Sequence, residues 1–305
     1  YVGVPQSSVA EWLGANVSAG QKIGFDPWLH GIDWARGLGK ALTAKGAQLV
    51  AVDVNPIDAA WDDQPVPSAA AVTVYDTKLA GQAATDKRAV IADWLKAKGL
   101  DTTVMTALDS IAWTFNIRGA DVSHTPVGLA FALLHADATA DLFIAPEKVT
   151  DAVRAHLGNS VRIHDRDAFE AALADLKDKK VAVDPDRAVA AIFTTLEAAG
   201  AKIARYRDPA VLPKAIKNDV ELGGTRAAHV RDGVAVSRFL QWMEAVAPQG
   251  GLDELGAAAK LREFREEGGG LVDLSFDTIS AAGPNGALPH YKVDETTNRA
   301  IETGT

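Results

Sequence analysis

The 305-residue sequence contains no cysteine, so it has no disulfide, no thiolate zinc site and no cysteine nucleophile. This is compatible with a cytoplasmic protein, which is the location we predict. Basic residues are outnumbered, because 31 Lys and Arg against 40 Asp and Glu give a formal net charge of −9. That balance argues against a nucleic-acid partner. No apolar run reaches the ~18 to 20 residues that span a bilayer, so we expect no membrane partner.

The composition is otherwise that of an ordinary globular protein. Hydrophobic residues make up 48% and charged residues 23%, in a chain long enough for two or three domains. The sequence opens at Tyr1 rather than at Met, and it ends abruptly after Ile301-Glu302-Thr303-Gly304-Thr305. We therefore expect a fragment at both ends.

A strand–helix–strand pattern occurs twice in the chain. Each copy has an apolar strand that ends in Asp-Pro, then a helix, a glycine and a second strand. The first copy comprises 22–27, 31–45, Gly46 and 48–52, and the second comprises 180–185, 187–198, Gly200 and 202–206. Because Asp-Pro has the same register in both copies, we predict two homologous α/β domains rather than a solenoid. The alternative is that any two such units look alike.

Changes in pattern along the chain predict the domain boundaries. The segment 62–68 is polar and rich in proline, as a linker is. After Pro213 the pattern becomes helical, with a long amphipathic helix over Asp219–Val246 and a second helix over 252–266. The apolar positions of the long helix include Val230 and Val234, which we expect to face a core. The predicted domains are 1–68, 69–212 and 213–305.

The stretch from Ser275 to Tyr291 has the most distinctive local pattern. Its alternating start, 275–279, predicts a strand, and Gly283, Pro284 and Gly286 then interrupt it. Glycine permits a positive φ and proline fixes φ, so such a turn can aim the side chain that follows. That side chain is His290, and we predict a functional role for it. The alternative is an ordinary histidine in a surface loop.

Four segments of the chain resemble the three-domain branch of the Xaa-Pro aminopeptidases (aminopeptidase P, family M24B). The segments are 108–122, 217–222 with 226–233, Phe264-Arg265 and 275–291. Each is weak alone, but they occur in the family's order. The resemblance implies an α/β fold with two creatinase N-terminal-like domains, followed by the first part of a pita-bread (α+β) catalytic domain. It also implies a homodimer that removes the first residue from small peptides with proline at the second position.

In that family two divalent metal ions, usually Mn2+, activate the attacking water. Their ligands are two Asp, one His and two Glu, and all lie downstream of the position that His290 matches. The first would fall a few residues past Thr305. No substitute such as His-Glu-x-x-His is visible in the sequence. We therefore expect no metal site in this chain and no activity from it alone, while a longer parent protein would be active.

Two other functions remain open at this point. The chain is alternatively a non-catalytic module of a pita-bread homologue that gates substrates, mediates dimerisation or binds a partner. A third possibility is another pita-bread reaction, such as creatine hydrolysis. The duplicated α/β domain argues against this third reading, since one such domain is the usual plan there.

Three residues are the candidates for the site. His290 matches the family histidine that hydrogen-bonds substrate or intermediate from outside the metal shell, which suits an imidazole near neutral pH. The guanidinium fork of Arg118 suits a peptide carboxylate or carbonyl; the alternative is an ion pair with Asp109 or Asp121. His124 lies in a loop and is a candidate to face the cleft. Nearby residues have other expected roles: Asn285 hydrogen-bonding the His290 loop or serving only the turn, Tyr291 in packing or behind the site, and His229 partly buried.

Overall fold

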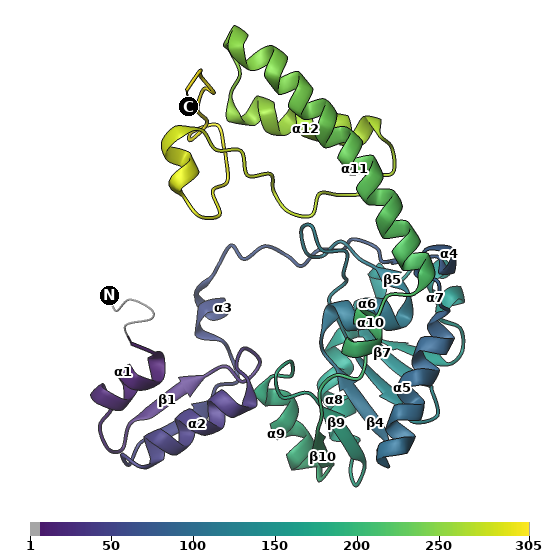
Figure 1. Ribbon diagram of the computed structural model, residues 1–305. Helices are drawn as coiled ribbons and strands as arrows, with labels where there is room; N and C mark the ends of the chain where they lie inside the picture. The colour runs from purple at the N-terminus through teal and green to yellow at the C-terminus, as the bar shows by residue number, and fades with distance from the viewer. Residues whose placement is uncertain (1–6, 305) are drawn as a thin grey trace. The chain divides into compact units, whose positions relative to one another are not determined.

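The computed structural model describes residues 7–304, so the expected fragment ends at Tyr1 and Thr305 lie outside the described residues. The chain divides into two compact units (Figure 1). The N-terminal unit contains the chain up to Thr77, Gln82–Asp121 and Val127–Ile216. The C-terminal unit contains Lys78–Gly81, Val122–Pro126 and the chain from Lys217 on. Within 7–304, no helix has the length and apolar character needed to cross a membrane.

The first strand–helix–strand copy folds as predicted. Helix α1 (Val9–Asn16) begins with the capping box of Ser8 and Glu11. Strands β1 (Lys22–Phe25) and β2 (Gln48–Ala51) pair in parallel. Helix α2 (Ile32–Thr43) connects them and buries one apolar stripe, which consists of Ile32, Ala35, Leu38 and Leu42.

The second copy belongs to a six-stranded mixed sheet. Its order is β10 (Lys202–Arg205), β9 (Lys180–Val183), β4 (Thr102–Met105), β6 (Ala130–His135), β7 (Ala140–Ile144) and β8 (Val161–His164). The helices of this part are α5 (Ala84–Lys98), α6 (Leu108–Phe115), α7 (Asp151–Leu157), α8 (Phe169–Ala174), α9 (Ala190–Ala199) and α10 (Val211–Ala215). The short elements are α3 (Pro56–Ala60), β3 (Thr73–Val74) and β5 (Ile117–Arg118). Parallel pairing of β9 with β10 repeats that of β1 with β2.

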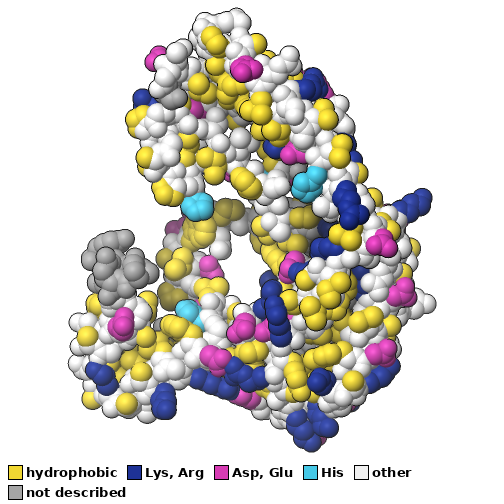
Figure 2. Space-filling view, viewed as in Figure 1, with side chains coloured by type: hydrophobic (Ala, Val, Ile, Leu, Met, Phe, Trp, Pro, Cys, Tyr) yellow, Lys and Arg dark blue, Asp and Glu magenta, His cyan; other side chains and the backbone are white. Residues whose placement is uncertain are grey.

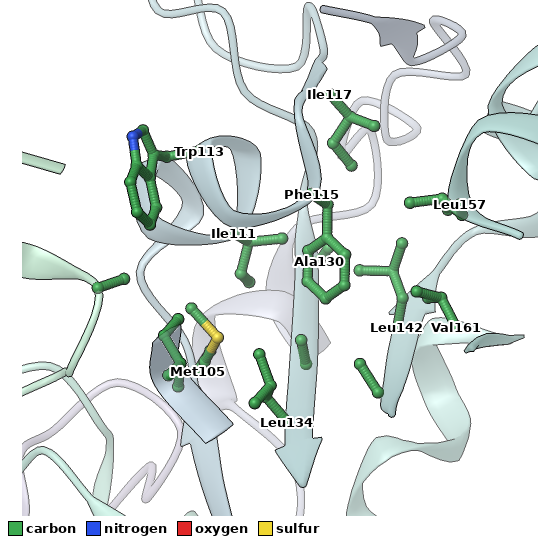
Figure 3. Packing of buried hydrophobic residues seen from close by; sticks show 14 of the residues in the cluster. Met105, Ile111, Trp113, Phe115, Ile117, Ala130, Leu134, Leu142, Leu157 and Val161 are labelled. Carbon is green, nitrogen blue, oxygen red and sulfur yellow. The ribbon is translucent and has the colours of Figure 1, made fainter. Parts of the chain in front are cut away.

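The main core lies between this sheet and its helices. Figure 3 shows Phe115 and Ile111 of α6 against Leu134 and Leu142 of the sheet. Phe115 and Leu134 are both 0% exposed. Strand β7 is buried along its whole length, which explains its nearly continuous apolar sequence.

The two strand–helix–strand copies contact each other through equivalent loops. Gly31 and Val189, which precede α2 and α9, form an antiparallel bridge. The Ala190 amide donates to the His30 carbonyl at 2.7 Å. Ion pairs Arg36–Glu197 and Asp33–Arg205 flank this contact. The segments after the two Asp-Pro turns thus form one interface, although the domain boundaries at 68 and 212 stay predictions.

One ion pair in the N-terminal unit is buried. Lys148 Nζ lies 2.7 Å from Asp121 Oδ2, and these side chains are 4% and 1% exposed. Burial raises the pKa of Asp121, but the hydrogen bonds from Lys148 and the Leu129 amide outweigh it and lower the pKa overall. The carboxylate is therefore charged near neutral pH, with its stabilising partner in direct contact.

A second charged cluster lies at the β7–β8 edge of the sheet. The Asp141 carboxylate accepts hydrogen bonds from Arg162 and faces His135 Nε2 at 2.8 Å and His164 Nε2 at 2.7 Å. Burial raises the pKa of Asp141, but these three partners outweigh it and hold the pKa far below its ordinary value. The sequence did not suggest this cluster, because its members come from three strands.

The C-terminal unit begins with a long helical hairpin. Helix α11 (Asp219–Val246) has the predicted bounds and starts with a capping box of Asn218 and Glu221. Helix α12 (Glu254–Glu267) packs antiparallel to it, with ion pairs Arg238–Glu267 and Asp232–Arg265. The short helix α4 (Thr77–Ala80) lies mostly in this unit.

The predicted core side of α11 is wrong. Val230 is 69% exposed and Val234 is 56% exposed, and Ala235 is the buried residue of this helix. His229, expected to be partly buried, is also exposed. Figure 2 shows hydrophobic side chains on the surface of this unit. The sequence pattern identifies an apolar stripe correctly, but periodicity does not say what covers it.

The predicted strand at 275–279 is also wrong. This segment runs as irregular chain, and no strand partner pairs with it within 7–304. Alternation specifies two faces, whereas a strand also needs a neighbour for its backbone hydrogen bonds. Phe276 is accordingly 65% exposed and Ile279 53% exposed.

Candidate functional site

The His290 loop, defined as residues 282–291, is a compact turn. Gly283 has a φ of +54°, which favours glycine, and opens a 3-10 turn over Gly283–Ala287. The Leu288 amide donates to the Asn285 carbonyl, and the Tyr291 amide donates to that of Leu288. His290 itself has a φ of +55° and is exposed. A non-glycine residue in the left-handed region is uncommon and persists where its surroundings impose it.

The surroundings of this loop converge on one buried carboxylate, Glu254, at the start of α12. Its side chain is 0% exposed. Ala282 N donates to Oε1 at 2.5 Å, and Tyr291 Oη donates to Oε2 at 2.8 Å. Asn285 Nδ2 lies 3.1 Å from Oε1, and the Arg299 amide donates to Oε2 at 3.1 Å. The beginning, middle and end of the loop therefore contact the same side chain.

The charge of this carboxylate follows from its partners. Burial raises the pKa of Glu254, but the donors of Ala282, Tyr291, Asn285 and Arg299 outweigh it and lower the pKa overall. Burial also raises the pKa of Tyr291, and the adjacent Glu254 adds to that rise. Near neutral pH the site therefore holds an anionic Glu254 and a neutral, hydrogen-bonded Tyr291.

The same carboxylate holds the segment that follows the loop. The Glu254 amide donates to the Arg299 carbonyl at 3.1 Å, the reciprocal of the bond from the Arg299 amide. Asp253 forms an antiparallel bridge with Ala300, and Asn298 Nδ2 donates to Asp253 Oδ2 at 2.9 Å. Residues 298–301 are thus paired with the start of α12.

His124 lies in the C-terminal unit, as His290 does. Its Nδ1 is 3.2 Å from Asp273 Oδ1 and its Nε2 is 3.1 Å from Asp277 Oδ1. Asp277 also pairs with Lys292, two residues after His290, at 2.7 Å. The backbone of His124 is left-handed, with a φ of +57°. The structure thus connects two of the three candidate residues through Asp277 and Lys292.

The His124 contacts predict a pH dependence. Hydrogen bonding to Asp277, together with Asp273, raises the pKa of His124. A raised folded-state pKa means that this stabilisation is fully present below the ordinary histidine pKa of about 6.5 and is lost as pH rises through the raised value. We expect the stability difference between wild type and His124→Gln, measured by urea denaturation, to shrink from pH 6 to pH 9. A difference that grows with pH would contradict the pairing.

Arg118 lies in the N-terminal unit, at the end of the short strand β5 that follows helix α6. Its Nη1 lies 3.1 Å from the Ala112 carbonyl and 2.9 Å from the Ile117 carbonyl. The guanidinium also covers the Tyr75 ring at 3.9 Å from its centroid. The two acids considered as ion-pair partners of Arg118 have other partners. Asp109 pairs with Lys214 and Arg187, and Asp121 pairs with Lys148. The substrate role of Arg118 stays a prediction.

The described residues do not fit a two-metal centre. Across 7–304, no group of three or more His, Cys, Asp or Glu side chains is placed to hold a metal ion. The loop supplies an imidazole, and the buried acid behind it is occupied by its own donors. This arrangement can present a hydrogen-bonding group, and it lacks the ligands for metal chemistry.

The fold and the site together define a class of protein, in which α/β domains precede a helical hairpin and a loop that carries a histidine. Residues 63–221 match the family described as Creatinase/Prolidase N-terminal domain, and residues 223–305 match Metallopeptidase family M24. The chain belongs to the creatinase/prolidase family and contains the start of an M24 pita-bread domain. The predicted fold class is confirmed.

Individual relatives narrow the similarity to one group within this family, the Xaa-Pro aminopeptidases. The chain is 36% identical over 297 residues to the "Probable Xaa-Pro aminopeptidase P" of Aspergillus clavatus, covering 93% of this chain and 45% of that protein. It matches the crystal structure of X-prolyl aminopeptidase from Caenorhabditis elegans, a cytosolic enzyme with a di-nuclear active site. That match has a TM-score of 0.89 and 32% identity, and covers 98% of this chain and 50% of the other. The chain therefore spans about half the length of these relatives.

A more distant structure supports the fold alone. The Xaa-Pro dipeptidase from Bacillus anthracis matches with a TM-score of 0.54 and 21% identity, over 72% of this chain and 58% of the other. The recognition of the chain as similar to Xaa-Pro aminopeptidases is thus confirmed by sequence and by structure.

Glu254 is the residue of the site that sequence reasoning missed. An acidic residue in the first turn of a helix is ordinary, because it complements the helix dipole. The one available signal was that Asp253 supplies the N-cap, so that Glu254 is not needed to cap the helix. Its partners lie far along the chain, at 282–299.

Proposed function

We propose that this chain is the N-terminal part of a metallo-aminopeptidase that releases the first residue from peptides with proline at the second position. The observation that carries the proposal is the match over 98% of the chain to an X-prolyl aminopeptidase. In this proposal the domains are 1–68, 69–212 and 213–305. The metal ions, which we expect to be two Mn2+, are held by residues beyond Thr305.

The role proposed for His290 is to hydrogen-bond the substrate or intermediate. Its imidazole is exposed, and no hydrogen-bond partner for it is found within 7–304, so it is available to a ligand. Imidazole donates or accepts a hydrogen bond near neutral pH, as a group that contacts a changing carbonyl must. His124 and Arg118 are proposed as further substrate-binding residues.

The surface of the C-terminal unit supports a continuation of the chain. Beside Val230 and Val234, the side chains of Leu240, Phe276 and Ile279 are exposed. An open hollow between the helical hairpin and the segment 271–279 is lined by Leu261, Leu271 and Phe276. Apolar surface of this extent favours a covering partner. We propose that the rest of the pita-bread domain covers it and supplies the missing strand neighbours.

The test is peptide hydrolysis by a protein that continues past Thr305, in the presence of Mn2+. A peptide that begins Xaa-Pro and its Xaa-Ala analogue are compared. We expect release of the first residue from the Xaa-Pro peptide alone, and none with the 305-residue chain. Equal cleavage of both peptides, or of neither, would contradict the proposed specificity.

The homodimer and the cytoplasmic location are proposed from the same similarity to Xaa-Pro aminopeptidases. Analytical ultracentrifugation tests the dimer.

A non-catalytic gating or dimerisation module is the second candidate. Both candidates are consistent with the lack of a metal-binding group within 7–304. The two candidates differ in their expectation for the longer protein, which takes up metal and cleaves peptides only under the first.

A further inference from the structure

The backbone of the His290 loop is constrained, although its functional side chain is free. The His290 imidazole is exposed, and the residue has a φ of +55°. Nothing in the imidazole's own contacts within 7–304 fixes its position, so its aim depends on the backbone. The residue after it, Tyr291, is 7% exposed and is anchored through its hydroxyl. The position of the imidazole is therefore set by whatever anchors Tyr291.

We propose that Glu254 is the positioning residue for His290, acting through Tyr291 and Asn285; this rests on the proposed peptidase function. Glu254 contacts the loop at three separate points. It accepts from the Ala282 amide at the first residue, from Asn285 in the middle, and from Tyr291 at the end. Three attachments to one rigid helix start leave the loop little freedom to rotate.

A carboxylate is required at this position because only donors face it. Both oxygens accept, and the partners are two backbone N–H groups, one amide NH2 and one phenol O–H. Asn285 Nδ2 also lies 2.9 Å from Tyr291 Oη, so the phenol accepts from Asn285 while it donates to Glu254. Gln would replace one acceptor by an NH2 that faces other donors. At least one buried N–H would then lose its partner, which is costly.

The network also joins the loop to the segment that follows it. Tyr291 Oη lies 3.1 Å from the Thr297 carbonyl, and Glu254 binds the Arg299 amide. Asp294 closes the turn between them by accepting from the Thr296 and Thr297 amides. Glu254 therefore fixes the position of the loop against the segment 297–301. If the carboxylate is lost, both the loop and this segment are expected to move.

The role predicts a particular kinetic result in the longer protein. Glu254→Gln is expected to lower kcat by about 10- to 100-fold, since a misplacement of ~1 Å costs up to that much. Tyr291→Phe keeps the ring and removes the hydrogen bond to Glu254, so it is expected to lower kcat by a smaller factor. This variant still tests the role if Glu254→Gln does not fold. The matched control is Glu266→Gln, an exposed acid of the same helix paired with Arg262, which is expected to change kcat less than about twofold.

A double-variant cycle separates positioning from general stability. If Glu254 acts through His290, then Glu254→Gln has little further effect, less than about twofold, in the His290→Ala background. Metal content stays equal to that of wild type in each variant. Effects that multiply independently, or a Glu254→Gln variant with wild-type kcat, would overturn the positioning role.

A second readout needs no activity. In the 305-residue chain, Glu254→Gln is expected to speed amide hydrogen exchange in peptides covering 282–299 by about tenfold or more, with exchange in the six-stranded sheet unchanged. Unchanged exchange at 282–299 would overturn the proposed attachment of the loop. A longer wild-type protein that cleaves no Xaa-Pro peptide would instead overturn the proposed function, so the two failures are distinguishable.

Discussion

His290→Ala in the longer protein is expected to lower kcat for an Xaa-Pro peptide by about 100- to 1,000-fold, the usual effect of removing one aimed hydrogen-bonding group from a reacting centre. The imidazole is exposed and comes directly before Tyr291, the residue by which Glu254 holds the end of the loop. Because the proposed contact of His290 is with the reacting group rather than with the fold, we expect the loss in kcat with little change in KM. Steady-state kinetics with saturating Mn2+ measures both.

The matched control is His229→Ala. His229 is also an exposed histidine of the C-terminal unit, and its Nδ1 lies 2.9 Å from the Thr225 carbonyl of its own helix. We expect kcat to remain within about twofold of wild type, as for other surface substitutions. His290→Ala with wild-type kcat would remove His290 from the site. A loss of bound metal in that variant would instead mean that the loop supports the metal centre.

Lys148→Met is expected to destabilise the N-terminal unit by about 3 to 5 kcal/mol, because it leaves the buried Asp121 carboxylate without its cation. The two side chains are 4% and 1% exposed, so water does not replace the lost partner. Chemical denaturation followed by circular dichroism measures the change. The pKa of Asp121 is lowered in the folded protein. The stability that its charged form contributes is therefore present above the ordinary Asp pKa and is lost in acid, so the effect of Lys148→Met should diminish as pH falls.

Two further variants distinguish a broken charge pair from a simple loss of packing. Combining Lys148→Met with Asp121→Asn removes both charges and is expected to recover part of the lost stability. Lys96→Met removes one side of the exposed Lys96–Asp93 pair and is expected to cost less than about 1 kcal/mol. A double variant less stable than Lys148→Met alone would contradict the buried-charge explanation.

Local patterns in the sequence were sufficient for most elements. The bounds of α11 were predicted from its amphipathic pattern, and the structure has the same bounds. The two strand–helix–strand copies were predicted from alternating runs that end in Asp-Pro, and both fold with parallel strands. Each of these signals lies within a few residues of the element that it specifies.

Features that depend on distant partners were not predictable in the same way. The segment 275–279 alternates as a strand does, but it has no neighbour to pair with among the described residues. The apolar stripe of α11 was recognised, while its exposure depends on what packs against it. Glu254 looks like an ordinary first-turn acid until its contacts with Ala282 and Tyr291 are seen. The loop was predicted, and its anchor was not.

The central proposal is that this chain carries one wall of a metallopeptidase site whose metal ligands lie beyond Thr305. Metal stoichiometry by elemental analysis tests it most directly, with the 305-residue chain and a protein that continues past Thr305 measured side by side after dialysis against Mn2+. We predict two metal ions per chain in the longer protein and none in the 305-residue chain, as expected where no metal-binding group occurs within 7–304. A longer protein that binds no metal, or a 305-residue chain that binds two ions, would contradict the account.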